Sequence, residues 1–90
     1  MLFFSIKSHF PLGQIIITKN SFERLPQGAL DAGIMRHGNR NWGNVRADMN
    51  DFALCHGGRL VSAYGEGTTQ FWIITESDRS VTTVMLPEDY

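Results

Sequence analysis

The chain has 90 residues, 42% of them hydrophobic, and its 8 Lys and Arg residues against 9 Asp and Glu residues give a formal net charge of −1 at pH 7. This length favours one domain with one small core, and the balanced charge argues against binding of nucleic acid through a basic surface. The single cysteine excludes an internal disulfide and is typical of a reducing compartment, and the Cys and His spacing of a zinc site is absent.

Residues 1–11 are expected to form an N-terminal arm or a short strand of one domain that spans residues 1–90. Met1 to Phe4 are apolar, but Ser5 and Lys7 interrupt the run, and no cleavage site of the secretory type follows it. No window approaches the ~20 apolar residues that a membrane span needs. We therefore expect a cytoplasmic protein without membrane contact.

The first regular element expected is a buried strand over residues 14–18, because three consecutive isoleucines are bounded by turn-forming residues. Asn20 or Ser21 is the expected cap of a short helix that follows the strand. This helix should stop near Leu25, since Pro26 disfavours a helical backbone in the residue before it.

A second helix is expected over residues 28–37, where Leu30, Ile34 and His37 fall on one stripe. The stripe predicts the face that the helix buries. His37 has two interpretations. It is either a general acid or base, since its ordinary pKa lies near 6.5, or a histidine that binds free carbonyl groups at the end of a helix.

A third helix is expected between a cap at Asn44 and a stop at Gly57 and Gly58. Cys55 is expected in the core, because neighbouring residues on a helix point about 100° apart and Cys55 cannot readily pair with His56 as nucleophile and base. The predicted buried face of this helix consists of Val45, Met49, Phe52 and Ala53.

After Gly58 the hydrophobic period changes from 3.6 to 2, which predicts strands over residues 59–64, 70–75 and 80–86. Short turns join them, so the three strands form an antiparallel meander. The expected fold is therefore α+β with two layers: an N-terminal strand, two to three short helices and then the three-stranded meander. The apolar strand around residues 71–75 should lie centrally in the sheet.

Polar side chains gather in the turn before the last predicted strand and at the start of that strand. Asp and Ser residues are common in tight turns, where they bind their own backbone. Alternatively, Glu76, Arg79 and a threonine such as Thr83 face a concave sheet, where the arginine and hydroxyl groups hold a phosphate or carboxylate. Asp78 lies in the same turn.

Trp42 is the one large apolar residue in the loop between the second and third helices. It either closes the edge of the core or forms an exposed anchor for a partner together with Arg40, because Trp and Arg dominate the energetics of protein interfaces. The candidate binding residues are thus Arg40, Trp42, Glu76, Asp78, Arg79 and Thr83.

Several segments resemble an uncharacterised group of small proteins encoded on bacterial plasmids and integrative elements. The resemblance lies in Trp42 and Gly43, in the stretch GRLVSAY over residues 58–64, and above all in IITESDRSVTTVMLPEDY over residues 73–90. It covers the chain from about Leu12, with departures in the first eleven residues and around residues 26–33. The resemblance implies an accessory protein of mobile DNA in a bacterial cytoplasm and carries no activity with it.

Two functions from different classes fit these observations. The first is a non-enzymatic accessory or inhibitory factor that binds a host or element-encoded protein, with no cofactor, no metal and nucleic acid disfavoured as a partner. This hypothesis needs only an exposed patch. A homodimer formed through the sheet is compatible with it.

The alternative is a small metal-free ribonuclease of the toxin type, by loose analogy with barnase-like and RelE-like folds. His37 would be the base, Arg59 or Arg79 the cation for the phosphate, and Glu76 the acid for the leaving group. This hypothesis requires the four side chains to meet at one cleft, and the net charge of −1 counts against it.

Overall fold

The sheet has four strands, and the computed structural model describes residues 8–90. The strands are β1 (Gln14–Ile17), β2 (Leu60–Tyr64), β3 (Phe71–Thr75) and β4 (Val81–Met85), in the order β1-β4-β3-β2. The predicted antiparallel meander is confirmed, with β3 inside the sheet, and the short helical turn η1 (Gly67–Thr69) lies between β2 and β3. The strand count and order differ slightly from expectation, because β1 joins the meander as a fourth strand, parallel to β4.

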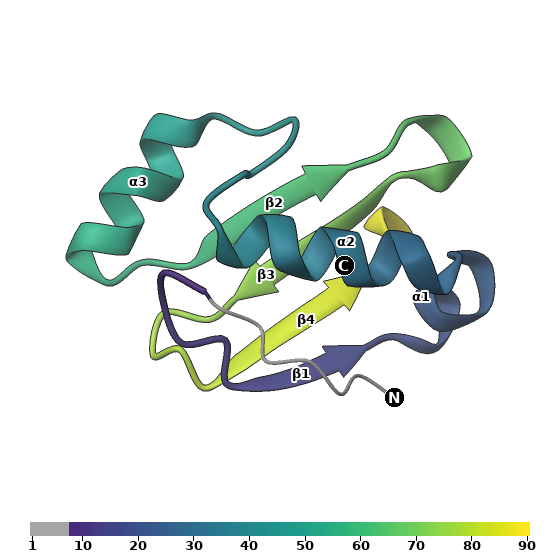
Figure 1. Ribbon diagram of the computed structural model, residues 1–90, viewed down its shortest axis with the longest axis horizontal. Coiled ribbons are helices and arrows are strands. Elements are labelled where there is room, and N and C mark those ends of the chain that lie inside the picture. The colour runs from purple at the N-terminus through teal and green to yellow at the C-terminus, as the bar shows by residue number, and fades with distance from the viewer. Residues whose placement is uncertain (1–7) are drawn as a thin grey trace.

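The helices α1 (Lys19–Arg24) and α2 (Gln27–Gly38) cover one face of the sheet, which confirms the two-layer α+β class (Figure 1). The cap of α1 is Thr18 rather than Asn20 or Ser21, since the Thr18 hydroxyl accepts the Ser21 amide at 3.2 Å. The helix ends at Leu25, before Pro26, as predicted. Of the predicted N-terminal arm, residues 1–7 lie outside the described part of the chain.

The main core forms where α2 packs on the sheet. The predicted stripe is confirmed, because Leu30, Ile34 and His37 are all buried. Gly33 on the same face lets the helix approach closely, since a Cβ there would lie 2.7 Å from the Phe71 ring. The sheet contributes the other large members of this core, among them Leu60, Tyr64, Phe71, Ile73 and Val84.

The helix α3 (Ala47–His56) follows a different arrangement, because it lies beside β2 at one end of the sheet (Figure 1). Its N-cap is Arg46 rather than Asn44, and it ends at Gly57 as predicted. The prediction that Met49 and Phe52 are buried is wrong, since they are 65% and 66% exposed. Cys55 is also exposed rather than in the core. The reason is positional: a helix beside a strand edge turns far less of its surface inward than one above a sheet.

The second face of the sheet is not covered by a helix within residues 8–90 (Figure 1). We call it the open face, and it begins beside β2 at Arg59 and Val61. The short helical turn η2 (Pro87–Asp89) brings Tyr90 to this face, where its ring meets Trp72 edge-on at 5.6 Å. Further members of the open face, by strand alternation, are Ala63, Ile74, Glu76, Thr83, Met85 and Ile16.

Candidate functional site

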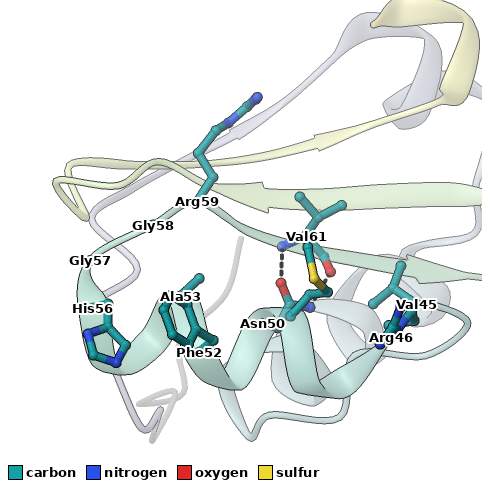
Figure 2. A pocket seen from close by; sticks show the side chains of 11 residues that line it. Val45, Arg46, Asn50, Phe52, Ala53, His56, Gly57, Gly58, Arg59 and Val61 are labelled. Atoms are coloured by element: carbon teal, nitrogen blue, oxygen red, sulfur yellow. Dashed lines mark hydrogen bonds between the residues drawn. The ribbon is translucent and has the colours of Figure 1, made fainter.

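A groove of about 570 Å³ runs between α3 and the start of β2 (Figure 2). Its apolar part comes from both sides, with Met49 and Phe52 on the helix and Val61 on the strand. Met49, Phe52 and His56 lie three and four residues apart, so they form one face of the helix. We call this space the α3–β2 groove; its other lining residues are Val45, Arg46, Asn50, Ala53, Gly57, Gly58 and Arg59.

Asn50 fastens α3 to the outer edge of β2. Its side-chain Nδ2 donates to the Val61 carbonyl at 2.6 Å, and its Oδ1 accepts the Val61 amide at 3.0 Å (Figure 2). The amide thereby replaces a neighbouring strand at this position. An exposed strand edge is a template for unwanted pairing, so Asn50 both joins the two walls of the groove and blocks the edge.

The next stretch of the β2 edge is covered by the loop before α3. The Ala63 amide donates to the Trp42 carbonyl at 3.1 Å, and the Asn44 amide donates to the Ala63 carbonyl at 2.8 Å. Gly43 permits this approach, because it has φ of +73° and a Cβ there would overlap the Ala63 carbonyl oxygen. The edge of β2 is therefore closed to strand pairing at both outward-facing residues of the strand.

Arg79 holds the far end of α3 from the turn between β3 and β4. Its guanidinium donates to the carbonyls of Gly58 at 2.7 Å and Ala53 at 3.4 Å, and to the Glu76 carbonyl of its own turn at 3.0 Å. The backbone of Arg79 has φ of +61°, in the left-handed region. The guanidinium that was predicted to bind an anion is thus occupied by backbone carbonyls.

Arg59 lies where the α3–β2 groove meets the open face, and in Figure 2 its side chain extends away from α3. It pairs with Glu76 across the β2–β3 pair at 3.3 Å and donates to the Tyr90 hydroxyl at 3.3 Å. The guanidinium also lies 5.9 Å from the centre of the Tyr90 ring. Arg59 thereby links the groove to Tyr90 and, through the Tyr90 ring, to Trp72 on the open face.

His37 is fully buried in a chain of hydrogen bonds that crosses the interior. Its Nδ1 lies 2.5 Å from Ser62 Oγ and its Nε2 lies 2.8 Å from Thr75 Oγ1. Thr75 in turn lies 2.7 Å from Thr82, which donates to the Leu12 carbonyl at 2.6 Å.

The direction of these bonds fixes the tautomer of His37. The Leu12 carbonyl can only accept a hydrogen bond, so the Thr82 hydroxyl donates its one proton to it. Thr82 must therefore accept the hydrogen bond from Thr75. Thr75 then accepts from His37, which places the ring proton on Nε2 and leaves Nδ1 to accept from Ser62. Burial, with a smaller contribution from the charge of Arg79, lowers the pKa of His37 to about 4. The imidazole is therefore neutral and structural at pH 7.

The four residues of the ribonuclease hypothesis do not line one accessible cleft. His37 has 0% of its surface exposed, and the guanidinium of Arg79 is bound to carbonyls. Arg59 and Glu76 lie together, but on the open face, paired with each other. His37 also binds side-chain hydroxyls rather than the free helix carbonyls of its other interpretation.

The candidate binding residues are distributed over several surfaces. Glu76 and Thr83 share the open face. Trp42 is only 3% exposed, so it closes the core, and its indole N–H and Arg40 both donate to Asp51 of α3 at 3.3 Å. Asp78 stays in its turn, where the Ser80 hydroxyl donates to it at 2.6 Å and lowers the pKa of its carboxyl.

The groove residues that sequence reasoning missed carried a misleading signal. Met49 and Phe52 have the spacing of a buried helix face, and nothing in a single sequence tells such a face from an unpartnered one. From the sequence, Tyr90 is part of a short polar tail. In the structure its ring contacts Trp72, because the turn η2 directs the end of the chain to the open face. That turn is held by Asp89, which accepts from Thr18 and Asn20 at 2.7 Å each.

Comparison of the chain with protein-family models, curated proteins and solved structures gave no match. Among residues 8–90, no helix combines the length and apolarity needed to cross a membrane. In the same part of the chain, no group of three or more His, Cys, Asp or Glu side chains is placed to hold a metal ion.

Proposed function

We propose that this protein is a non-enzymatic binding factor whose α3–β2 groove docks another protein, in the setting of bacterial mobile DNA that its sequence resemblance implies. The observation that carries the proposal is the exposure of Met49 and Phe52, 65% and 66%, on a helix that is firmly attached to the domain. Contiguous exposed apolar surface of this kind marks interaction sites.

The attachment of α3 distinguishes this surface from a loosely packed helix. Asn50 binds β2, Asp51 binds Trp42 and Arg40, and the end of the helix binds Arg79. Each of these contacts is polar and orients the helix; Ala53 and Leu54 pack partly against the core, while Met49 and Phe52 stay exposed. A preorganised apolar groove loses little entropy when a partner binds.

The ribonuclease alternative receives no support from the geometry. A general base must come within hydrogen-bond distance of the proton that it removes, and the His37 imidazole is enclosed between Phe10, Trp42 and the sheet. The neutral, hydrogen-bonded ring serves packing instead.

The proposal is tested by partner capture that depends on the groove. A double variant Met49→Ser with Phe52→Ser is compared with wild type and with Phe22→Ser, which removes an equally exposed phenylalanine (65%) from α1. The three proteins are cross-linked in a bacterial host that carries the parent element, and the captured proteins are identified and purified.

We expect wild type and Phe22→Ser to form a complex with the same purified partner, and the groove variant to lose it. Equal binding by all three proteins would show that the groove is not the docking site. Cleavage of a labelled RNA by pure wild-type protein, abolished in His37→Gln, would overturn the non-enzymatic assignment.

A further inference from the structure

We propose that the partner is an acidic segment: it places a carboxylate on Arg59 while an apolar side chain of the same segment fills the α3–β2 groove. This inference rests on the proposed function and names the chemistry of its partner. It follows from three observations about Arg59: its position, the looseness of its present contacts, and the charges around the groove.

Arg59 lies, with Val61, where the α3–β2 groove meets the open face. It is a groove-lining residue, and it is also paired across the sheet with Glu76 on the open face. Tyr90 and Trp72 lie on its far side. Arg, Tyr and Trp are the residue types that contribute most to protein interfaces, and here Arg59 of the groove lining contacts Tyr90, which contacts Trp72.

The present contacts of Arg59 are longer than those of Arg24 and Arg79 and as long as the contact of Arg40 with Asp51. Its distances to Glu76 and Tyr90 are 3.3 to 3.5 Å. Arg24 reaches Glu88 at 2.6 Å, and Arg79 reaches the Gly58 carbonyl at 2.7 Å. The Arg59 and Glu76 side chains are each 44% exposed, and such exposed pairs contribute little to stability. Arg59 can therefore exchange Glu76 for an incoming carboxylate at small cost.

The charges that line the groove have one sign. The only residues among its lining that can carry charge are Arg46, His56 and Arg59, and no carboxylate lines it. Asp48 and Glu76, the partners of the two arginines, lie outside the lining. The carboxylates that pair with Arg46 and Arg59 therefore lie beyond the groove lining, and the lining itself supplies guanidinium groups and no carboxylate. A carboxylate on Arg59 can form the paired hydrogen bonds that a guanidinium fork favours, whereas a basic segment would be repelled.

The test uses two synthetic amphipathic peptides of about twelve residues that differ only in charge. Both carry Leu and Phe on one face; one has Glu at every other position and the other has Lys. Each is titrated into the full chain while backbone amide and methyl NMR signals are recorded. Two variants each remove one positive charge: Arg59→Gln at the groove and Lys19→Gln, an exposed residue of α1, as the matched control.

We expect the Glu peptide to shift the signals of Met49, Phe52 and Val61 and the Lys peptide to leave them unchanged. Arg59→Gln should weaken binding of the Glu peptide about tenfold, Lys19→Gln should leave it unchanged, and Arg59→Glu should bind the Lys peptide instead.

Three results would overturn the inference. Equal binding of both peptides in the groove would remove the charge selection while leaving the proposed function intact. Binding of neither peptide, in a protein that still captures its partner through the groove, would exclude an acidic amphipathic segment. Shifts of Met49 and Phe52 that depend on protein concentration alone would identify a second copy of this chain as the occupant.

Discussion

The helices α2 and α3 meet the same sheet in opposite ways. From α2, Leu30 and Ile34 are buried to 1% exposure over the face of the sheet. From α3, the residue fully turned inward is Asn50, which binds the edge of β2 through two hydrogen bonds. The helix α2 is held by fully buried apolar side chains, whereas α3 is held by polar contacts and by the partly buried Ala53 and Leu54.

A helix that is bound to a strand edge by hydrogen bonds needs only a small apolar inner face, which in α3 is Ala53 and Leu54. Unpaired backbone groups at that edge bind a side-chain amide, so Met49 and Phe52 of α3 can stay exposed. Changes at Ile34, His37 and Asn50 test the buried contacts that hold α2 and α3 in place. A change at Phe52 tests a side chain that α3 leaves exposed.

The largest loss of stability is expected from Ile34→Ala in α2. Truncating a fully buried isoleucine removes its burial and leaves a cavity, which lowers the free energy of unfolding by roughly 2–5 kcal/mol. Urea denaturation measures this loss. The control is Met35→Ala on the exposed side of the same helix (45% exposed), which should change stability by less than about 0.5 kcal/mol. Similar losses in both variants would contradict the burial of the stripe.

The second prediction concerns pH and the histidine at the end of α2. The pKa of His37 is about 4 in the folded state and about 6.5 when unfolded, so the unfolded chain binds the proton more readily. Stability is therefore complete above pH 6.5, falls as the pH drops toward 4, and loses about 3 kcal/mol over that window. Urea denaturation at a series of pH values measures the slope.

The control for this prediction is His37→Gln, whose amide does not titrate. The variant should be less stable than wild type but lack the slope between pH 6.5 and 4. Asp78 and Asp89 have pKa values lowered by their hydrogen bonds, so their contributions are lost below about pH 4, outside the window. An unchanged slope in the variant would assign the effect to another group.

The third change, Asn50→Ala, should loosen the attachment of α3 to β2. Asn50→Ala leaves the Val61 amide and carbonyl without the partners that the side chain supplied, which costs about 2 kcal/mol in unfolding free energy. Hydrogen exchange should show faster exchange at the Val61 amide, with little change in β3. The matched control is Asn39→Ala, which removes an exposed side-chain contact to the Met35 carbonyl. Unchanged exchange at Val61 would contradict the role of Asn50.

The same difference between α2 and α3 separates the features of the fold that local sequence patterns predict from those that they do not. Local signals identified the strands, the end of α1 before Pro26 and the buried stripe of α2, because these depend on periodicity and backbone chemistry. The parallel pairing of β1 with β4 and the place of α3 beside β2 depend on contacts between distant residues. Local patterns carry no information on such distant contacts, and for this reason the sequence predicts Met49, Phe52 and Cys55 to be buried although they are exposed.

The candidate site was predictable only in part, and for the same reason. The sequence prediction placed Glu76, Arg79 and a threonine such as Thr83 on one face of the sheet; Glu76 and Thr83 do share the open face, since residues two apart in a strand share a face, but the Arg79 guanidinium binds carbonyls instead. The roles of Arg79 and His37 were not predictable, because each is decided by long-range partners: carbonyls of α3 for the arginine and hydroxyls of three strands for the histidine.

The smallest expected effect on stability comes from Phe52→Ser in α3. The ring is 66% exposed and its aromatic neighbour is His56, stacked at 4.2 Å on the same helix, so its removal should change the free energy of unfolding by less than about 0.5 kcal/mol. Urea denaturation of this variant beside Phe22→Ser gives the comparison, because both phenylalanines are equally exposed. A loss above about 1.5 kcal/mol would place Phe52 in a packed contact and remove it from the docking surface. If the Phe52→Ser variant keeps its stability but no longer binds the partner, the two helices have different roles: α2 stabilises the fold, and α3 presents the residues that bind.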